Sequence, residues 1–380
     1  MQSSSAPAAP SGQDPAPLLL FTDLNRDPDD LTALVVATAL HARGAIELAC
    51  VVTALGDREM RRRRARLAKA VLETLGLPGV EVGVGGDYAI AVRDAGGVLD
   101  REATESRRAD HQLFLDHPFV QPEGAVAADG LSLLAAALEQ VPDRAALLLV
   151  IAGMTDLAAL LRLAPGLVRR KAARVVIMGG IEAEPDERGF VRADRRAYNN
   201  IADQPAADFV HARLQELGVP LVVVTKEAAY AAAVTRGFYE ALAATGHPVG
   251  VCLRQQQRRA LANLWSNVRA GRLLPQLTPA WFFETFTGRQ PDAAAVPAAR
   301  DPAQADPDPF DAVWRQVTRL NLYDPIALLA ATPGLRERLF RPRVPLATGG
   351  GAAILGEDAV TDPAQVRELL GELALAALTR

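Results

Sequence analysis

The chain has 380 residues, of which 49% are hydrophobic and 23% are charged, a balance that suits a large buried core in a soluble protein. Its net charge of −4 argues against a dedicated nucleic-acid binder, and its two cysteines exclude a disulfide framework and a cysteine-rich zinc site. No apolar stretch is both long enough and free enough of charge to span a membrane. We therefore expect a cytoplasmic protein with no nucleic-acid or membrane partner, built as one large domain with insertions.

The N-terminal segment differs in composition from the rest of the chain. Residues 1–17 are mostly Ser, Ala, Pro, Gly and Gln, and they lack the basic start of a signal peptide. We predict a disordered tail at 1–17 and one folded domain over 18–380.

Apolar, strand-like runs then alternate with helix-like segments. Buried strands are predicted at 18–21, 46–53, 80–84, 147–152, 175–178 and 221–225. Helices are predicted to start at 31 and to occupy 57–75, 157–162, 206–217, 250–271 and the region 310–331. Single helices between short apolar strands predict an α/β fold, with an open, mostly parallel sheet flanked by helices.

Some residues in this pattern have an ordinary structural interpretation. The run Arg61 to Arg64 lies in the helix predicted at 57–75 and would wrap around it, so we interpret it as a solvated face. Cys50 and Cys252 lie in apolar surroundings and are interpreted as buried thiols. Two segments interrupt the alternation: 85–130 is predicted to be a lid-like insertion, and 290–309, rich in Pro, Ala and Asp, a mobile loop.

An acidic cluster follows the first predicted strand. Asp23, Asp27, Asp29 and Asp30 lie within eight residues, between the end of that strand and the start of the first helix. Ligands of open α/β sheets bind at such strand ends. Like charges this close repel one another, so the cluster favours a bound cation, whereas a solvated loop with acids at a helix N-terminus is the simpler alternative.

Other strand ends carry polar residues that could share this site. They include Gly56-Asp57, Ala152 to Asp156, Tyr198-Asn199-Asn200 and, later in the chain, Tyr323-Asp324. Ca²⁺ takes six to eight oxygen ligands, which this set can supply, and the amides of Asn199 and Asn200 can bind a polyol. The histidines do not recur at the spacing of a helical zinc site.

Taken in order, these motifs resemble those of the inosine–uridine nucleoside hydrolase superfamily, from residue 18 to about 333. The family's acidic opening motif is similar to Asp23-x-Asn25-x-Asp27-x-Asp29-Asp30. Its later segments are similar to Gly56-Asp57, Ala152-Gly153-Met154-Thr155-Asp156, Tyr198-Asn199-Asn200 and Tyr323-Asp324-Pro325. Each match is weak alone, but five in the correct order are specific.

The resemblance implies a nucleoside-hydrolase-like fold and a Ca²⁺ enzyme, with Mg²⁺ as the other candidate ion, that cleaves the N-glycosidic bond of a ribonucleoside with water. By position, the implied metal ligands are Asp23, Asn25, Asp30, the Ala152 carbonyl and Asp324. The implied substrate contacts are Asp29, Asp57, Tyr198, Asn199 and Asn200. The metal would orient the water and lower its pKa, and the acids would stabilise an oxocarbenium-like sugar.

Several residues depart from the family pattern. Asn25 stands where the family has an aspartate that serves as ligand and presumed base, and an amide cannot accept the proton. Asp27, where the family has Gly, is our candidate for the missing base. Tyr198 replaces a Glu of the ribose site, and Tyr323 replaces a His beside the leaving group. Lys226 follows a strand where the family often has His, and burial beside Val222 to Val224 would make it a useful acid; a surface ion pair is its alternative. We therefore predict Asp27, Asp29, Lys226 and Tyr323 as catalytic, and leave the leaving group open.

Aromatic residues near the strand ends are candidates for stacking on a base, with ordinary packing as the alternative for each: Tyr88, His111, Phe119, Tyr230 and Trp265. A catalytically inactive ribose- or nucleoside-binding homologue is the competing function, because Asn25 and Asp57 are changes that could disable the enzyme. A phosphohydrolase of the haloacid dehalogenase kind is disfavoured, because it needs an acid where Asn25 stands. The expected partner is a small riboside, and a homo-oligomer is left open.

Overall fold

The computed structural model describes residues 14–24, 27–86, 117, 119–120, 125–273, 277–289, 310–343 and 351–380. Its centre is a seven-stranded sheet in the order β3-β2-β1-β4-β5-β6-β7, and every neighbouring pair is parallel. The strands are β1 (Ala16–Thr22), β2 (Ile46–Thr53), β3 (Glu81–Val84), β4 (Ala146–Val150), β5 (Ala172–Gly179), β6 (Leu221–Thr225) and β7 (Ala352–Leu355). The predicted parallel α/β sheet is confirmed.

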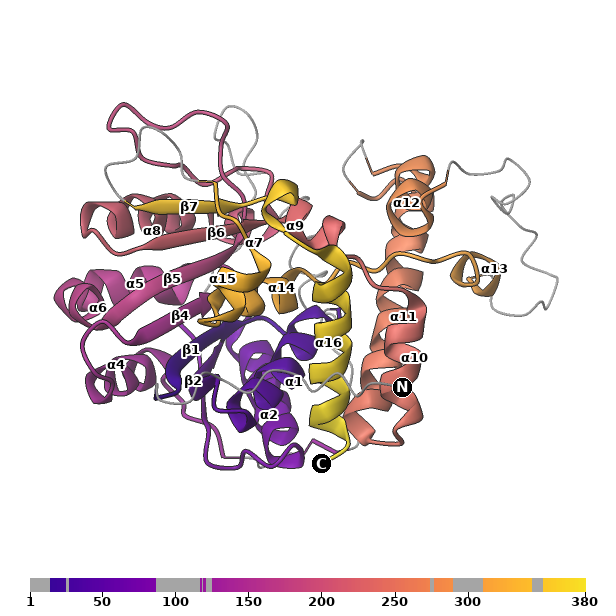
Figure 1. The fold of residues 1–380 in the computed structure, drawn as a ribbon, viewed down its shortest axis with the longest axis horizontal. Helices are drawn as coiled ribbons and strands as arrows, with labels where there is room; N and C mark the ends of the chain where they lie inside the picture. The colour runs from indigo at the N-terminus through magenta and orange to yellow at the C-terminus, as the bar shows by residue number, and fades with distance from the viewer. Residues whose placement is uncertain are drawn as a thin grey trace.

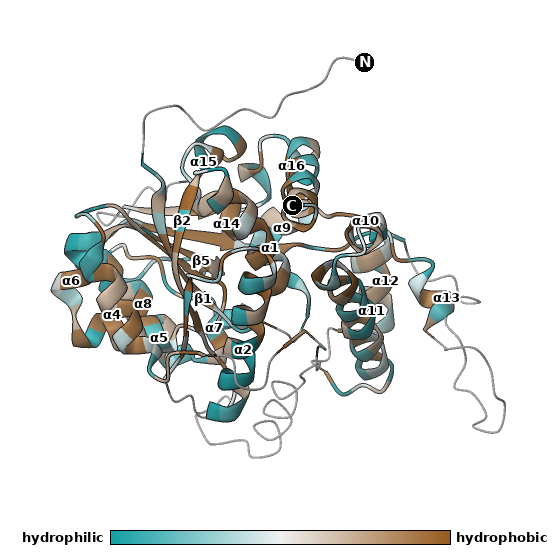
Figure 2. Ribbon diagram, turned by 90° about the horizontal axis from the view of Figure 1, so that it is seen from below, coloured by the Kyte–Doolittle hydropathy of each residue, from teal (hydrophilic) through white to brown (hydrophobic). Residues whose placement is uncertain are grey.

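Helices cover both faces of the sheet because alternate side chains of the strands point to opposite sides. In β1, Leu18 and Leu20 join one buried cluster, and Leu19 and Phe21 join the other. The first cluster includes α1 (Asp29–Ala42), α2 (Arg58–Thr74), α14 (Tyr323–Ala331) and α16 (Pro363–Leu378). The second includes α4 (Gly130–Gln140), α5 (Thr155–Leu163), α6 (Pro165–Lys171) and α8 (Gln204–Glu216). Figure 2 shows the apolar strands between these two layers.

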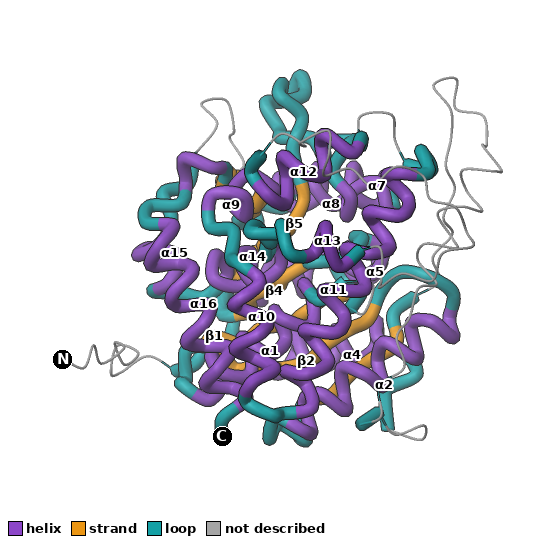
Figure 3. The backbone as a smooth tube through the Cα atoms, turned by 90° about the vertical axis from the view of Figure 1, so that its right-hand side faces the viewer, coloured by secondary structure: helices purple, strands orange, loops and turns teal. Residues whose placement is uncertain are grey.

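A group of helices stands beside the sheet, beyond α16 in Figure 1. It consists of α10 (Arg236–Ala244), α11 (Pro248–Arg269), α12 (Pro279–Thr287) and the short α13 (Asp311–Trp314). Figure 3 shows α10 and α11 from the side, in front of α1 and the strands. The predicted helical region 310–331 is therefore two helices, α13 and α14, with residues 315–322 between them outside any helix.

Short helices complete the fold: α7 (Tyr198–Ala202), α9 (Lys226–Ala231), α15 (Leu335–Leu339) and a 3-10 turn at Glu357–Ala359. None of the described helices is long and apolar enough to cross a membrane. β1 starts at Ala16, so the predicted tail is shorter than 1–17, and residues 1–13 lie outside the described part. The insertion at 85–130 falls mostly outside it as well, although Ala127 pairs with the edge strand β3, and the loop 290–309 falls outside it entirely.

The interpretation of Arg61 to Arg64 as a solvated face is wrong for two of the four residues. Arg61 and Arg64 are 1% and 0% exposed. Arg61 donates to the Gly56 carbonyl at 2.7 Å, and Arg64 donates to the Ala54 and Leu55 carbonyls at 2.9 and 2.5 Å. These bonds hold the loop after β2, whose Leu55 has a φ of 67°. Cys50 and Cys252 are buried free thiols, as predicted.

Candidate active site

The strand order places a crevice at one point of the sheet. β2 and β3 extend from one side of β1, whereas β4 to β7 extend from the other, so the order reverses between β1 and β4. Such a switch point is where open α/β sheets bind their ligands, outside the carboxyl ends of the strands. A cavity of about 460 Å³ lies here, and its lining includes Asp23 after β1, Ile151 after β4, Gly179 at the end of β5 and Lys226 after β6.

The acids of the predicted cluster line this cavity. Asp23, Asp29, Asp30 and, from α14, Asp324 are each between 5% and 7% exposed, and Asp27 is partly buried. Residues 25 and 26 lie outside the described part, so the position of Asn25, a predicted ligand, is not described. The structure therefore brings five of the predicted carboxylates together, from two parts of the chain that are about 300 residues apart.

Backbone amides and a hydroxyl fix two of these carboxylates. Asp30 Oδ1 accepts from Thr22 Oγ1 at 2.5 Å and from the Asp23 amide at 3.1 Å. Asp29 Oδ2 accepts from the amides of Tyr323 and Asp324, at 2.9 and 3.3 Å. These amides begin α14, where the helix dipole favours an anion. Asp29 Oδ1, by contrast, is buried with no hydrogen-bond partner within the described residues.

Burial and mutual repulsion destabilise the charged form of the carboxylates in this cluster. The pKa values of Asp29, Asp30 and Asp324 are each raised well above the ordinary value, first by burial and then by the neighbouring aspartates. A hard cation would offset both causes, and the oxygen donors suit Ca²⁺ or Mg²⁺. Within the described residues, however, no three acidic, histidine or cysteine side chains stand close enough to hold one ion, so binding would require the carboxylates to close around it.

Asp27 lies at the edge of this acidic group. Its Oδ1 accepts from the Asp29 amide at 3.2 Å, and its carbonyl accepts from Gln256 Nε2 of α11 at 2.7 Å. The second contact ties the acidic loop to the group of helices beside the sheet. Asp27 is therefore held against the cavity while its side chain stays partly accessible to water.

The segment after β5 contributes two of its three predicted residues to the cavity. Tyr198 and Asn199 line it, and Asn199 Nδ2 donates to the Met178 carbonyl at 3.0 Å. Asn200 does not line it: this side chain is fully buried and donates to the carbonyls of Gly180 and Asp194, both at 2.9 Å. Asn200 thus fastens the turn that follows β5.

Two other predicted residues lie apart from the lining of the cavity. Asp57 is the N-cap of α2 and accepts from the Met60 amide at 2.8 Å. Ala152 is completely buried directly after the lining residue Ile151. An N-cap needs a short acceptor at the first turn of a helix, which accounts for Asp57 without a ligand.

Tyr323 and Lys226 both line the cavity, in different environments. The Tyr323 hydroxyl accepts from Asn321 Nδ2 at 3.2 Å, and its ring meets Tyr230 edge-on at 6.1 Å. Burial, followed by the neighbouring Tyr230, raises the pKa of Tyr323 well above its ordinary value. Lys226 is exposed, so the burial expected for it is absent, and it forms no ion pair within the described residues.

The aromatic candidates are mostly packing residues. Trp265 is 3% exposed and packs against Phe282 and Phe283, with ring centres 4.9 and 5.5 Å away, so its prediction as a base contact is replaced by a core role. Phe119 stacks on His117 at 5.6 Å, and neither it nor Tyr230 lines the cavity. Tyr88 and His111 lie outside the described residues.

Residues that the sequence analysis missed complete the lining of the cavity. They are Gln257, Asn263 and Asn267 of α11, Trp281 and Phe286 of α12, Tyr239 of α10, and Arg196 and Asn321 from loops. The α11 residues in this lining recur at helical spacing, so amides interrupting an apolar helix face were a readable signal. No local pattern indicates that this helix faces the strand ends.

Comparisons with known proteins give the family of the chain and support its fold. The model of the family "Inosine-uridine preferring nucleoside hydrolase" matches residues 18–346. The type III effector protein XopQ, solved as a complex with adenosine diphosphate ribose, is 42% identical with a TM-score of 0.82, over 97% of this chain and 95% of that chain. The effector protein XOO4466 is 41% identical with a TM-score of 0.81, over the same shares of the two chains.

A purine-preferring ribonucleoside hydrolase from Gardnerella vaginalis has a TM-score of 0.60 at 16% identity, over 96% of this chain and 100% of that chain. This second kind of likeness supports the fold alone. No curated protein sequence matches the chain. The family match spans most of the sequence, including all five motifs and the acids that line the cavity. The chain belongs to the inosine–uridine preferring nucleoside hydrolase family.

Proposed function

We propose that this protein hydrolyses the bond between a ribose and its leaving group, with a ribonucleoside or a related riboside as substrate. The observation that carries the proposal is the convergence of five carboxylates, from the β1–α1 connection and from α14, on one cavity at the switch point of the sheet. XopQ, 42% identical, was solved with adenosine diphosphate ribose, which supports a ligand with a ribosyl group.

The acidic end of the cavity is the proposed place for Ca²⁺ or Mg²⁺. Asp23, Asp30 and Asp324 would hold the ion, with the Ala152 carbonyl and Asn25 as the further ligands that the family pattern implies. A divalent ion there would lower the pKa of water and neutralise the carboxylates. The raised pKa values of Asp30 and Asp324 and the unpartnered oxygen of Asp29 support this assignment.

The remaining chemistry falls to the protein's own side chains. Water forms a new C1′–O bond as the C1′–N bond breaks, and Asp27 takes the proton of the water. Asp29 Oδ1 accepts a hydrogen bond from a ribose hydroxyl, while the surrounding carboxylates stabilise the positive charge that develops on the sugar. The leaving group departs with the electron pair of the C1′–N bond and is finally protonated from solvent. The Tyr323 hydroxyl donates a hydrogen bond to it.

The competing function is an inactive homologue that binds ribosides, which the replacement of the usual base by Asn25 favours. Release of p-nitrophenolate from p-nitrophenyl riboside, and of base from inosine and uridine, separates the two. We expect turnover that stops with EDTA and returns with calcium, and that Asp324→Asn abolishes. Calorimetric binding of inosine without any turnover would establish the inactive homologue. The absence of both binding and turnover would overturn the riboside site itself.

A further inference from the structure

We propose that the preferred ligand of this site is a riboside that carries a phosphoryl group on its 5′ carbon, recognised by Arg196 and Lys226. The inference rests on the ribose-binding part of the proposed function and is independent of hydrolysis. It comes from the uneven distribution of charge around the cavity, from the way Arg196 is held, and from the unpaired state of Lys226.

The described acids and cations in the lining of the cavity come from different elements. All five described carboxylates belong to the β1–α1 connection, to the start of α1 or to α14. The described cations in its lining are Arg196, from the connection after β5, and Lys226, at the start of α9 after β6. No acid from the connection after β5 is among the described lining residues. Such a cavity suits a ligand with hydroxyls at one end and an anion at the other.

The two cations belong to neighbouring strand ends. Gly179, the last residue of β5, is in register with Thr225, the last residue of β6, and Lys226 follows directly. Hydrogen bonding to Asp194 is the main cause of the raised pKa of Arg196, and Glu227, next to Lys226, adds to it, so the two connections interact electrostatically. In the order β1-β4-β5-β6, a strand spacing of about 4.8 Å puts the end of β5 roughly 10 Å, and the end of β6 roughly 14 Å, from the end of β1. A ribose ring with its 5′ substituent, together with the reach of the long Arg196 and Lys226 side chains, can span these intervals.

Asp194 holds the Arg196 guanidinium by one edge. Nε and Nη2 donate to the two oxygens of Asp194, at 3.0 and 3.3 Å, and the Arg196 amide donates to Oδ1 at 2.9 Å. A guanidinium has five N–H donors in a fixed fork. Nη1 makes no hydrogen bond with any described residue, so that edge can donate to phosphoryl oxygens.

The backbone beneath Arg196 is also firmly held. The Asp194 amide donates to the Gly180 carbonyl at 3.0 Å, and Asn200 Nδ2 bonds to the carbonyls of both residues. A Cβ on Gly180 would come within 3.0 Å of Ala197 Cβ, so the missing side chain allows the turn to approach the strand. The guanidinium therefore starts from a positioned turn rather than from a free loop.

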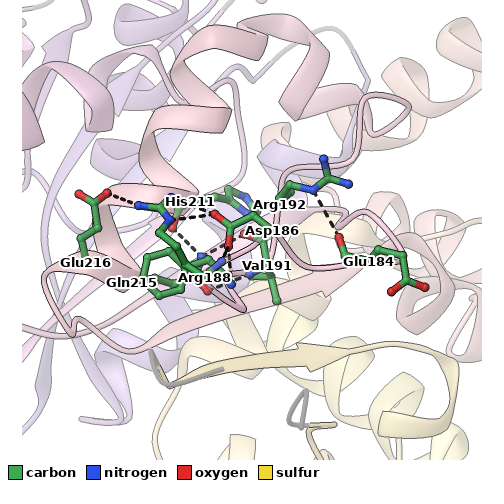
Figure 4. A network of polar contacts seen from close by, with 9 residues as sticks. Glu184, Asp186, Arg188, Val191, Arg192, His211, Gln215 and Glu216 are labelled. Atoms are coloured by element: carbon green, nitrogen blue, oxygen red, sulfur yellow. Dashed lines mark hydrogen bonds and ion pairs between the residues drawn. The ribbon is translucent and has the colours of Figure 1, made fainter. Parts of the chain in front are cut away.

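The preceding loop is fastened to α8, as Figure 4 shows. Gln215 accepts from the Val191 amide at 2.9 Å and donates to the Val191 carbonyl at 3.0 Å. Arg188 joins Asp186 to Glu216, with its contact to Glu216 at 2.8 Å. Positioning of this kind lowers the entropic cost of binding, which is what a specificity residue needs.

Lys226 adds an ammonium that has no ion-pair partner among the described residues. It is exposed and forms no ion pair within the described residues, although Glu227 is its sequence neighbour. An exposed lysine at a helix start opposes the helix dipole, so it does not stabilise the helix by itself. An incoming phosphoryl group would meet this ammonium at the lining of the cavity.

Calorimetry on the full chain in calcium tests the inference with ribose, ribose 5-phosphate and inorganic phosphate as probes. We expect ribose 5-phosphate to bind at least 10-fold more tightly than ribose or phosphate. Arg196→Gln and Lys226→Gln should each remove about 10-fold of that advantage while leaving ribose affinity unchanged. Arg192→Gln is the matched control, because Arg192 is exposed on the same loop but does not line the cavity.

Equal affinities for ribose and ribose 5-phosphate would overturn the inference, as would no detectable binding of ribose 5-phosphate or an equal loss in the Arg192→Gln control. If Arg196→Gln lowers stability by freeing Asp194, Lys226→Gln, which breaks no described contact, carries the same comparison. The two proposals fail separately. Turnover of p-nitrophenyl riboside with equal affinities for ribose and ribose 5-phosphate would support the hydrolase and overturn this inference. Tighter binding of ribose 5-phosphate without turnover would support this inference and overturn the hydrolase.

Discussion

Substitutions of Asp29 can separate its role as a hydrogen-bond acceptor in the fold from its role in the reaction. Asp29→Ala leaves the amides of Tyr323 and Asp324 without the oxygen that they now share. An unsatisfied amide costs about 1–3 kcal/mol, and Tyr323 is only partly buried, so the free energy of unfolding should fall by about 2–4 kcal/mol. Asp29→Asn keeps an acceptor and removes a buried charge, so its change should stay within about 1 kcal/mol.

The assay is urea denaturation followed by circular dichroism, with EDTA present so that metal binding does not contribute. Both Asp29 variants should lose riboside turnover by about 10²-fold or more, because neither keeps the carboxylate. Asp57→Ala is the control: it removes an N-cap worth about 1 kcal/mol outside the cavity and should retain turnover. Equal destabilisation by Asp29→Ala and Asp29→Asn would refute the acceptor role, and full turnover by Asp29→Asn would refute the ribose contact.

Three further predictions follow from particular contacts. Asp27→Asn should slow riboside turnover by about 10²–10⁴-fold, far more than Asp57→Asn, and equal mild losses would show that Asp27 is only loop charge. Tyr323→Phe should slow inosine cleavage much more than p-nitrophenyl riboside cleavage, because an activated leaving group needs no donor; uniform losses would mean that the ring only shapes the cavity. Burial lowers the pKa of His211 from 6.5 to about 4. Between these two pH values the unfolded chain binds a proton that the native state does not bind, so the free energy of unfolding falls as the pH falls. In urea denaturation, the free energy of unfolding of His211→Phe should therefore fall by about 3 kcal/mol less than that of the wild type between pH 6.5 and pH 4. Parallel pH profiles of the two proteins would contradict this.

The sheet and the acidic end of the site could be predicted because their signals are local. β1 is an unbroken apolar run that is buried on both faces, and its run ends at Asp23, where the polar pattern starts. β7 is only four residues long and shares its composition with the Gly- and Ala-rich sequence before it, so no prediction included it. No prediction included the C-terminal helix α16 either, which packs on α1.

The part of the lining that α11 contributes could not be predicted because it depends on tertiary placement. Asn263 and Asn267 are four residues apart and so share a helix face, but the spacing does not show what that face meets. Arg61 and Arg64 look like solvent-facing charges in sequence, yet the strained loop after β2 gives them buried carbonyls to satisfy. Lys226 had two interpretations, burial beside β6 or a surface ion pair; it lies directly after the strand and is exposed, without an ion pair among the described residues.

Calcium binding to the metal-free full chain is the measurement that tests the acidic site most directly. Titration calorimetry should give one ion per chain, and calcium at 100 times its dissociation constant should add about 2.7 kcal/mol to the stability by linkage. Asp324→Asn should weaken this binding, whereas the N-cap variant Asp57→Asn should not. No heat of binding and an unchanged melting curve at saturating calcium would contradict the account.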